Sequence, residues 1–127
     1  MKKATKLLSL LISITVISAW TIRFNLPSIF RGGEAENMLE EFTLYGLSNS
    51  TMIIVGVTKV IVSILLVLGA FKFRSLVKPS AGIMAMFMIG AVYFHFSVGD
   101  GIIPTIPSAS MLLSCFIILF LKSSHDK

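Results

Sequence analysis

A lysine, a histidine and an aspartate are the residues of this sequence best suited to binding a ligand. Lys59 interrupts an apolar stretch, TMIIVGVTKVIVSILLVLGAF, at residues 51–71. His95 lies near the end of a later apolar stretch, and Asp100 follows it in a glycine-rich turn. An ionised lysine deep in a membrane helix costs about 2.5–3.5 kcal/mol, so it should face protein or a wet cavity and find a partner there. We therefore expect Lys59, His95 and Asp100 to line a polar pocket.

Each side chain would bring a different chemistry to such a pocket. The Lys59 ammonium would attract an anion or polarise a carbonyl group, more strongly in a low dielectric than in water. His95 would donate or shuttle a proton. Structural roles stay open beside these. A glutamate from residues 34–41 or backbone carbonyls would satisfy Lys59, and His95 would cap its helix by bonding to Asp100 or to carbonyls.

The sequence lacks a motif that identifies a reaction. Cys115 is the single cysteine and lies on a different apolar stretch from His95, a combination that makes no zinc, haem or iron–sulfur site. Met84 and Met88 share a helical stripe with His95, and we expect them to pack rather than to bind a metal. We expect no metal site. Catalytic residues are not identifiable, so the sequence leaves open whether the protein is an enzyme.

Composition indicates an integral membrane protein. Of the 127 residues, 55% are hydrophobic and 13% are charged, and the mean hydropathy is +0.91. A soluble domain this short would need a polar exterior, whereas a domain in a bilayer offers apolar side chains to lipid. The net charge of +5 does not indicate nucleic-acid binding, because the basic residues stand at the ends of apolar stretches and form no patch with aromatic residues.

The apolar stretches predict an all-α, four-helix membrane bundle that forms a single domain over residues 1–127. The expected spans are about 7–24, 51–71, 79–98 and 105–122, with an outer loop over residues 25–50. At a rise of about 1.5 Å per residue, segments of this length can cross a hydrocarbon core of about 30 Å. Lysines before the first stretch also fit a secretory signal peptide, but no small-residue cleavage site stands out, so we expect a retained helix.

The outer loop is where most of the acidic residues collect. Residues 34–45 are expected to form a short amphipathic helix with glutamates on one face, lying on the membrane or over the helix ends. A solvated linker helix with no further role is the alternative. In the last span, Thr105 is the expected N-cap.

Basic residues set the expected orientation. Most of them occur in the N-terminal segment, in the connection at residues 72–78 and at the C-terminus, on one side of the four-span layout, while Arg23 and Arg31 fall on the other side. The glutamates fall on the other side. By the positive-inside rule, both termini are cytoplasmic, and we expect a multi-pass protein of a bacterial cytoplasmic membrane.

Two segments resemble the DoxX-like family of membrane proteins. They are VGVTKVIVSILLVLGAFKF and MIGAVYFHFSVGDGIIPTIPSA, with a long polar loop between the first two spans. The resemblance covers roughly residues 7–121 and implies a four-helix bundle. Some relatives are small subunits of thiosulfate:quinone oxidoreductases, and a eukaryotic branch acts in receptor assembly, so a quinone is a candidate cofactor. DoxX proteins tend to carry glutamate where this sequence has Lys59, whereas His95 and Asp100 match the DoxX-like branch.

Two functions follow as hypotheses. In the first, an outward-opening pocket with Lys59, His95 and Asp100 binds a quinone headgroup or a small anionic redox ligand such as a sulfur oxyanion. In the second, the protein is an accessory or assembly subunit whose glutamate-rich loop docks another membrane protein. Transport is a weaker third class, because no carboxylate lies within a span. The expected partners are the lipid bilayer and either another membrane protein or a second copy of the chain.

Overall fold

The described part of the chain is helical, with no strand. The computed structural model describes residues 3–121. Its helices are α1 (Lys3–Trp20), α2 (Met38–Leu44), α3 (Asn49–Phe71), α4 (Val77–Ser97) and α5 (Ile102–Phe120), with a 3₁₀ turn, η1 (Arg74–Leu76), before α4. Within these residues, the four helices other than α2 are long and apolar enough to cross a membrane. The predicted all-α, four-helix membrane bundle is confirmed.

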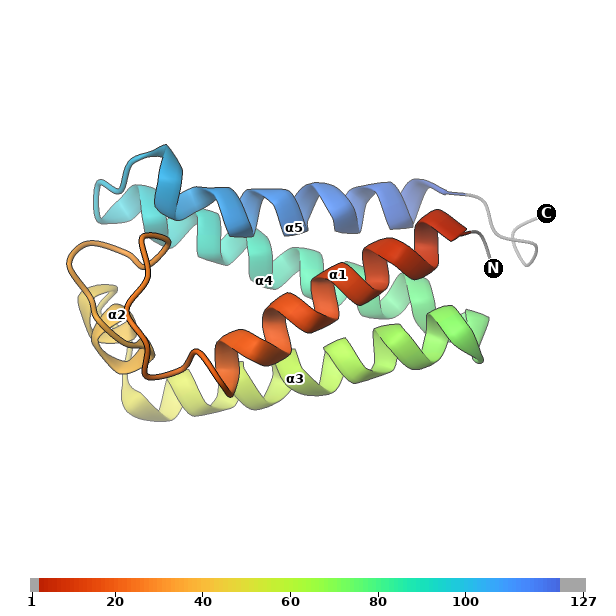
Figure 1. Ribbon diagram of the computed structural model, residues 1–127, viewed down its shortest axis with the longest axis horizontal. Coiled ribbons are helices and arrows are strands. Elements are labelled where there is room, and N and C mark those ends of the chain that lie inside the picture. Colours follow the sequence, from red (N-terminus) through yellow and green to blue (C-terminus); the bar gives the residue numbers. More distant parts are fainter. Residues whose placement is uncertain (1–2, 122–127) are drawn as a thin grey trace.

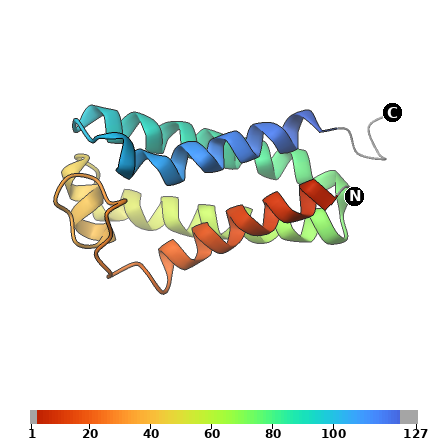
Figure 2. The same ribbon diagram turned by 45° about the horizontal axis from the view of Figure 1, so that its top comes forward.

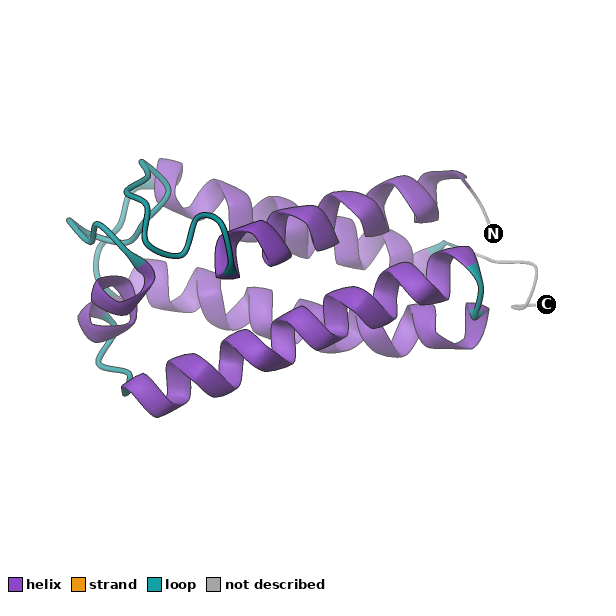
Figure 3. Cartoon of the chain, turned by 60° about the horizontal axis from the view of Figure 1, so that its bottom comes forward, coloured by secondary structure: helices purple, strands orange, loops and turns teal. Residues whose placement is uncertain are grey.

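The long helices pack lengthwise into one bundle. Helix α1 runs beside α3, α4 runs beside α5, and α3 also contacts α4 (Figures 1 and 2). The loop at residues 21–37, α2 and the turn at residues 98–101 gather at one end, which we call the loop end (Figure 3). The beginning of α1, the end of α5 and η1 lie at the other, terminal end.

Carboxylates and most basic side chains lie at opposite ends of the bundle, and the basic residues of the loop end are Arg23, Arg31 and Lys59 among those described. The carboxylates of the described residues belong to the loop end: Glu34, Glu36, Glu40, Glu41 and Asp100. The terminal end carries basic residues: Lys3, Lys6, Lys72, Arg74 and Lys78. Lys2, Lys122 and Lys127, on which the orientation also depends, lie outside the described residues. The cytoplasmic placement of both termini stays a prediction, which this separation supports.

Small residues let α1 and α3 approach closely. The hydroxyl of Ser13 donates a hydrogen bond to the backbone oxygen of Ser63 at 2.9 Å, and Gly56 faces the Trp20 ring. In lipid, helices associate through such close packing and through hydrogen bonds between helices. Gly56 and Ser63 share a face of α3 with Lys59 and permit this close approach of α1.

Two helix boundaries differ from the sequence prediction at the loop end. Helix α2 begins at Met38 rather than Glu34, because the Asn37 side chain caps it by accepting a hydrogen bond from the Glu40 amide at 2.8 Å. Helix α1 ends at Trp20 rather than near Phe24. The chain beyond Trp20 forms turns that provide backbone carbonyls to arginine side chains.

The start of α5 also differs from the prediction. Gly101 occupies the N-cap position in place of Thr105, whose hydroxyl instead donates to the Gly101 oxygen at 3.1 Å. Pro104 is tolerated because the first backbone amides of a helix have no partner within it. Pro107 lies inside the helix. Similarly, α4 begins at Val77, so Pro79 falls within its first turn.

We expect Gly56→Ala to lower bundle stability by about 1–3 kcal/mol. The added methyl group would overlap the Trp20 ring, which is confined by Phe24 and Phe42 at centroid distances of 6.0 and 5.6 Å. Gly82→Ala is the control, since the same methyl group there has no atom within 4 Å and should leave stability unchanged or higher. The midpoints of unfolding in detergent, measured by the loss of helicity, are compared between the two variants. Equal midpoints would contradict the close contact between Gly56 and Trp20.

Candidate functional site

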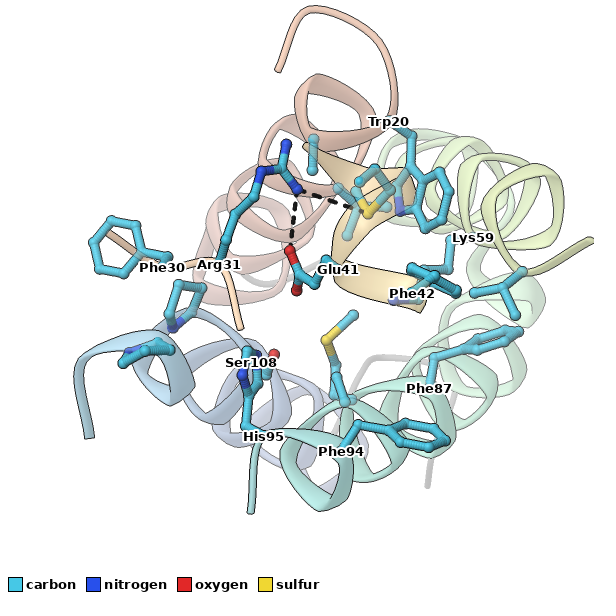
Figure 4. A pocket seen from close by; sticks show the side chains of 18 of the residues that line it. Trp20, Phe30, Arg31, Glu41, Phe42, Lys59, Phe87, Phe94, His95 and Ser108 are labelled. Atoms are coloured by element: carbon cyan, nitrogen blue, oxygen red, sulfur yellow. Dashed lines mark hydrogen bonds and ion pairs between the residues drawn. The ribbon is translucent and has the colours of Figure 1, made fainter. Parts of the chain in front are cut away.

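A cavity of about 390 Å³ lies at the loop end. Residues from α1, the 21–37 loop, α2, α3, α4 and α5 surround it (Figure 4). Aromatic rings form much of its wall, contributed by Trp20, Phe42, Phe87 and Phe94. The polar residues on the wall include Arg23, Arg31, Glu41, Tyr45, Lys59, His95 and Ser108. An apolar cavity of this size with a few polar groups is typical of a small-molecule site.

Lys59 brings a positive charge into this cavity without a bonded partner. Its ammonium lies 5.8 Å from the Trp20 ring centroid and 5.8 Å from that of Phe87. These distances allow attraction to both aromatic faces. Among residues 3–121, the Lys59 ammonium makes neither a hydrogen bond nor an ion pair. Glu41 attracts it through space but is bonded to other groups. The ammonium therefore keeps its three hydrogen-bond donors for another molecule.

Arg31, and not Lys59, pairs with a glutamate of residues 34–41. The buried guanidinium donates from Nη1 to Glu41 Oε2 at 3.1 Å (Figure 4). Its Nη2 donates to the backbone oxygens of Arg23 and Phe24 at 2.6 and 3.1 Å, and its Nε to that of Leu26 at 2.8 Å. Arginine suits this role because its planar fork carries five donors. The contacts fasten the 21–37 loop to α2.

A chain of polar contacts continues from Glu41 to the far side of the cavity. The Tyr45 hydroxyl lies 3.0 Å from Glu41 Oε1 and 3.3 Å from His95 Nδ1. His95 Nδ1 lies 2.7 Å from Asp100 Oδ2, and Asp100 Oδ1 accepts a hydrogen bond from the Gly33 amide at 2.7 Å. We call the set Arg31, Glu41, Tyr45, His95 and Asp100 the polar chain. It connects α2, α4 and the 98–101 turn to the 21–37 loop.

Local backbone geometry brings Asp100 back to His95. Gly99 adopts a positive φ of 74°, and its amide bonds to the Phe96 oxygen at 3.1 Å. The Asp100 amide bonds to the His95 oxygen at 2.9 Å. This pattern ends many helices with a left-handed glycine. The Gly-Asp turn therefore places the carboxylate directly beside the imidazole.

The donor and acceptor groups along the polar chain indicate where its hydrogens lie. Burial, and then the charge of Glu41, raise the pKa of Tyr45, so its phenol keeps a hydrogen and donates it to Glu41. The Asp100 carboxylate accepts a hydrogen from the Gly33 amide and has none to donate, so His95 Nδ1 carries the hydrogen of the bond between them. Nε2 of His95 has no hydrogen-bond partner among the described residues, and its ring lines the cavity.

A comparison with protein families now identifies the chain. The model of the DoxX-like family matches residues 11–118. The chain belongs to the DoxX-like family. The resemblance found in the sequence is therefore confirmed, and the matched region includes the cavity and the polar chain. Searches of curated proteins and of solved structures gave no match.

The fold of this DoxX-like protein brings two of the three predicted site residues to the cavity. Lys59 and His95 both line it. Asp100 is not among the lining residues and lies behind His95, with only 5% of its side chain exposed. His95 and Asp100 form the hydrogen bond that the structural alternative for His95 expected. The roles of Lys59, His95 and Asp100 toward a ligand stay predictions.

The side chains that could bind a metal ion do not cluster in the described part of the chain. Within residues 3–121, no group of three or more histidine, cysteine, aspartate or glutamate side chains is placed to hold a metal ion. Met84 and Met88 are buried in the core, as expected.

Arg31 and Tyr45 were not predicted to be central. The two hints were an arginine inside an otherwise acidic loop and a tyrosine at the end of a short amphipathic helix.

We expect Arg31→Met to destabilise the protein by about 3–5 kcal/mol, because it leaves Glu41 and several carbonyls without their donor in a buried place. Arg23→Met is the control. Arg23 is half-buried and bonds only to the Ser18 hydroxyl at 3.2 Å and the Thr15 oxygen at 2.8 Å, so its loss should cost about 1 kcal/mol. Denaturation in mixed detergent micelles compares the two variants. Similar losses of stability would show that Arg31 has no special role.

Proposed function

We propose that this DoxX-like membrane protein binds a quinone-like molecule, an apolar ring bearing oxygen substituents, in the cavity at the loop end. One observation carries the proposal: the Lys59 ammonium reaches an aromatic-walled cavity and has no bonded partner among the described residues. A bound ring oxygen would supply that partner. Hydrogen bonds to charged groups are worth about 1.5–3 kcal/mol, more than bonds between neutral groups.

The walls of the cavity support a ring better than a small anion. Trp20, Phe42 and Phe87 offer flat apolar surfaces, and aromatic rings pack well in stacked or edge-on arrangements. A sulfur oxyanion would use Lys59 but would gain nothing from these walls. It would also meet the Glu41 carboxylate, which lines the same cavity. The ring is therefore the ligand class that uses most of the lining.

A second candidate function is an accessory subunit that docks another membrane protein. It is favoured by the exposed glutamates of the loop end, Glu34, Glu36 and Glu40. This hypothesis predicts a stoichiometric protein partner and does not explain why the Lys59 ammonium has no bonded partner among residues 3–121. For either function, we place the protein in a bacterial cytoplasmic membrane, with the cavity toward the outer face.

We expect a decyl-substituted 1,4-benzoquinone to quench the fluorescence of Trp20, the single tryptophan of the chain and part of the cavity wall. Titration of the purified protein in detergent gives the dissociation constant. Lys59→Met should weaken binding at least about tenfold, since it removes a charged hydrogen bond. The variant should fold, because the substitution removes a costly charge from a membrane helix.

Lys72→Met is the matched control. Lys72 lies at the terminal end, where its ammonium is 5.4 Å from the Phe73 ring, so this variant should bind the quinone as the wild type does. Equal affinities in the two variants would contradict the proposal. A change in Trp20 fluorescence on adding thiosulfate, with no change on adding the quinone, would instead favour the anionic ligand.

A further inference from the structure

We infer that the cavity selects a ring that carries a hydroxyl group, the reduced form, over the same ring with a carbonyl group, and that Asp100 sets this preference through His95. The inference rests on the proposed function, because it concerns the form of the ligand bound in the same cavity. Lys59 plays no part in the choice, since an ammonium donates to a hydroxyl oxygen and to a carbonyl oxygen alike.

His95 is the residue that distinguishes the two forms. Its Nδ1 hydrogen is held by Asp100 at 2.7 Å. In a neutral imidazole with hydrogen on Nδ1, Nε2 carries a lone pair and only accepts hydrogen bonds. Nε2 has no partner among the described residues, and the ring lines the cavity. A ligand hydroxyl would donate to Nε2, whereas a carbonyl oxygen at the same place would set one lone pair against another.

The surroundings of His95 hold this arrangement in place. Tyr45 lies 3.3 Å from Nδ1, but its own hydrogen is directed to Glu41 at 3.0 Å, so it does not donate to the imidazole. Glu41 in turn is paired with Arg31 at 3.1 Å. These contacts hold the hydrogen of the neutral imidazole on Nδ1 rather than on Nε2.

Asp100 acts as a positioning residue, and a single substitution should reverse its effect. The Gly33 amide donates to Asp100 Oδ1 at 2.7 Å. In Asp100→Asn, this amide would hold the oxygen of the new side chain and turn its NH₂ group toward His95. Nδ1 would then accept a hydrogen bond, and the hydrogen would move to Nε2. The altered ring would donate into the cavity and favour the carbonyl form.

The test compares the two redox forms of one probe. The decyl-substituted benzoquinone is titrated against the purified protein by Trp20 fluorescence, and its hydroquinone, kept reduced under argon, is titrated in competition with it. We expect the wild type to bind the hydroquinone about tenfold more tightly than the quinone, the effect of one good hydrogen bond. Asp100→Asn should reverse the order. His95→Leu should bring the ratio of the two affinities close to one.

Any other result would contradict the inference. The results also distinguish a failure of this inference from a failure of the proposed function. If the wild type binds both forms equally and Lys59→Met loses this binding, the proposed function holds but the preference for the reduced form does not. Binding of neither form would remove both. An unchanged preference in Asp100→Asn would show that Asp100 does not set the hydrogen position. Glu40→Gln is the control, because Glu40 is exposed and bonds only to Asn37 and the Glu36 amide.

Discussion

The ion pair between Arg31 and Glu41 determines how charge is distributed at the loop end. A carboxylate beside a membrane-embedded lysine would ordinarily neutralise it, because an isolated charge in a low dielectric is costly. Here the carboxylate is already held by the Arg31 guanidinium at 3.1 Å and by the Tyr45 hydroxyl at 3.0 Å. Lys59 is left with two aromatic faces and the cavity. The pair therefore both fastens the loop and leaves the ammonium available.

The same end of the bundle combines a firmly held polar chain with an apolar chamber. Three of the Arg31 donors bind carbonyls of the 21–37 loop, and Asp100 binds both His95 and the Gly33 amide. Few groups at the cavity wall are thus free to turn toward a ligand. A site whose polar groups are held by a second layer of hydrogen bonds recognises its ligand by geometry. Among the described residues, the Lys59 ammonium and His95 Nε2 are two groups at the cavity wall without such a bond.

The sequence predicted the parts of this arrangement that depend on local pattern. Apolar stretches gave the membrane helices, and the Gly-Asp turn gave the bond to His95. The resemblance of two segments gave the family. These features depend on residues near one another in the chain, or on helix periodicity, which a single sequence displays.

The sequence could not predict which charges pair across the loop. Glu41 was one of several carboxylates, and its choice of Arg31 over Lys59 depends on turns at residues 21–37 that bring backbone carbonyls around the guanidinium. Asp100 was expected in the pocket, but the turn at Gly99 directs its carboxylate behind His95. The start of α2 at Met38 follows from the Asn37 cap, whereas the sequence predicted a helix from residue 34. Such choices are made by tertiary contacts.

We propose that the Lys59 ammonium, which has no bonded partner in the described part of the chain, is available to bind a small molecule. Native mass spectrometry of the protein purified in a mild detergent, with extraction and identification of bound small molecules, tests this claim most directly. The account predicts a ring compound with oxygen substituents in near-stoichiometric amount in the wild type and its loss in Lys59→Met. A stoichiometric protein partner with no bound small molecule, unchanged by the substitution, would contradict it.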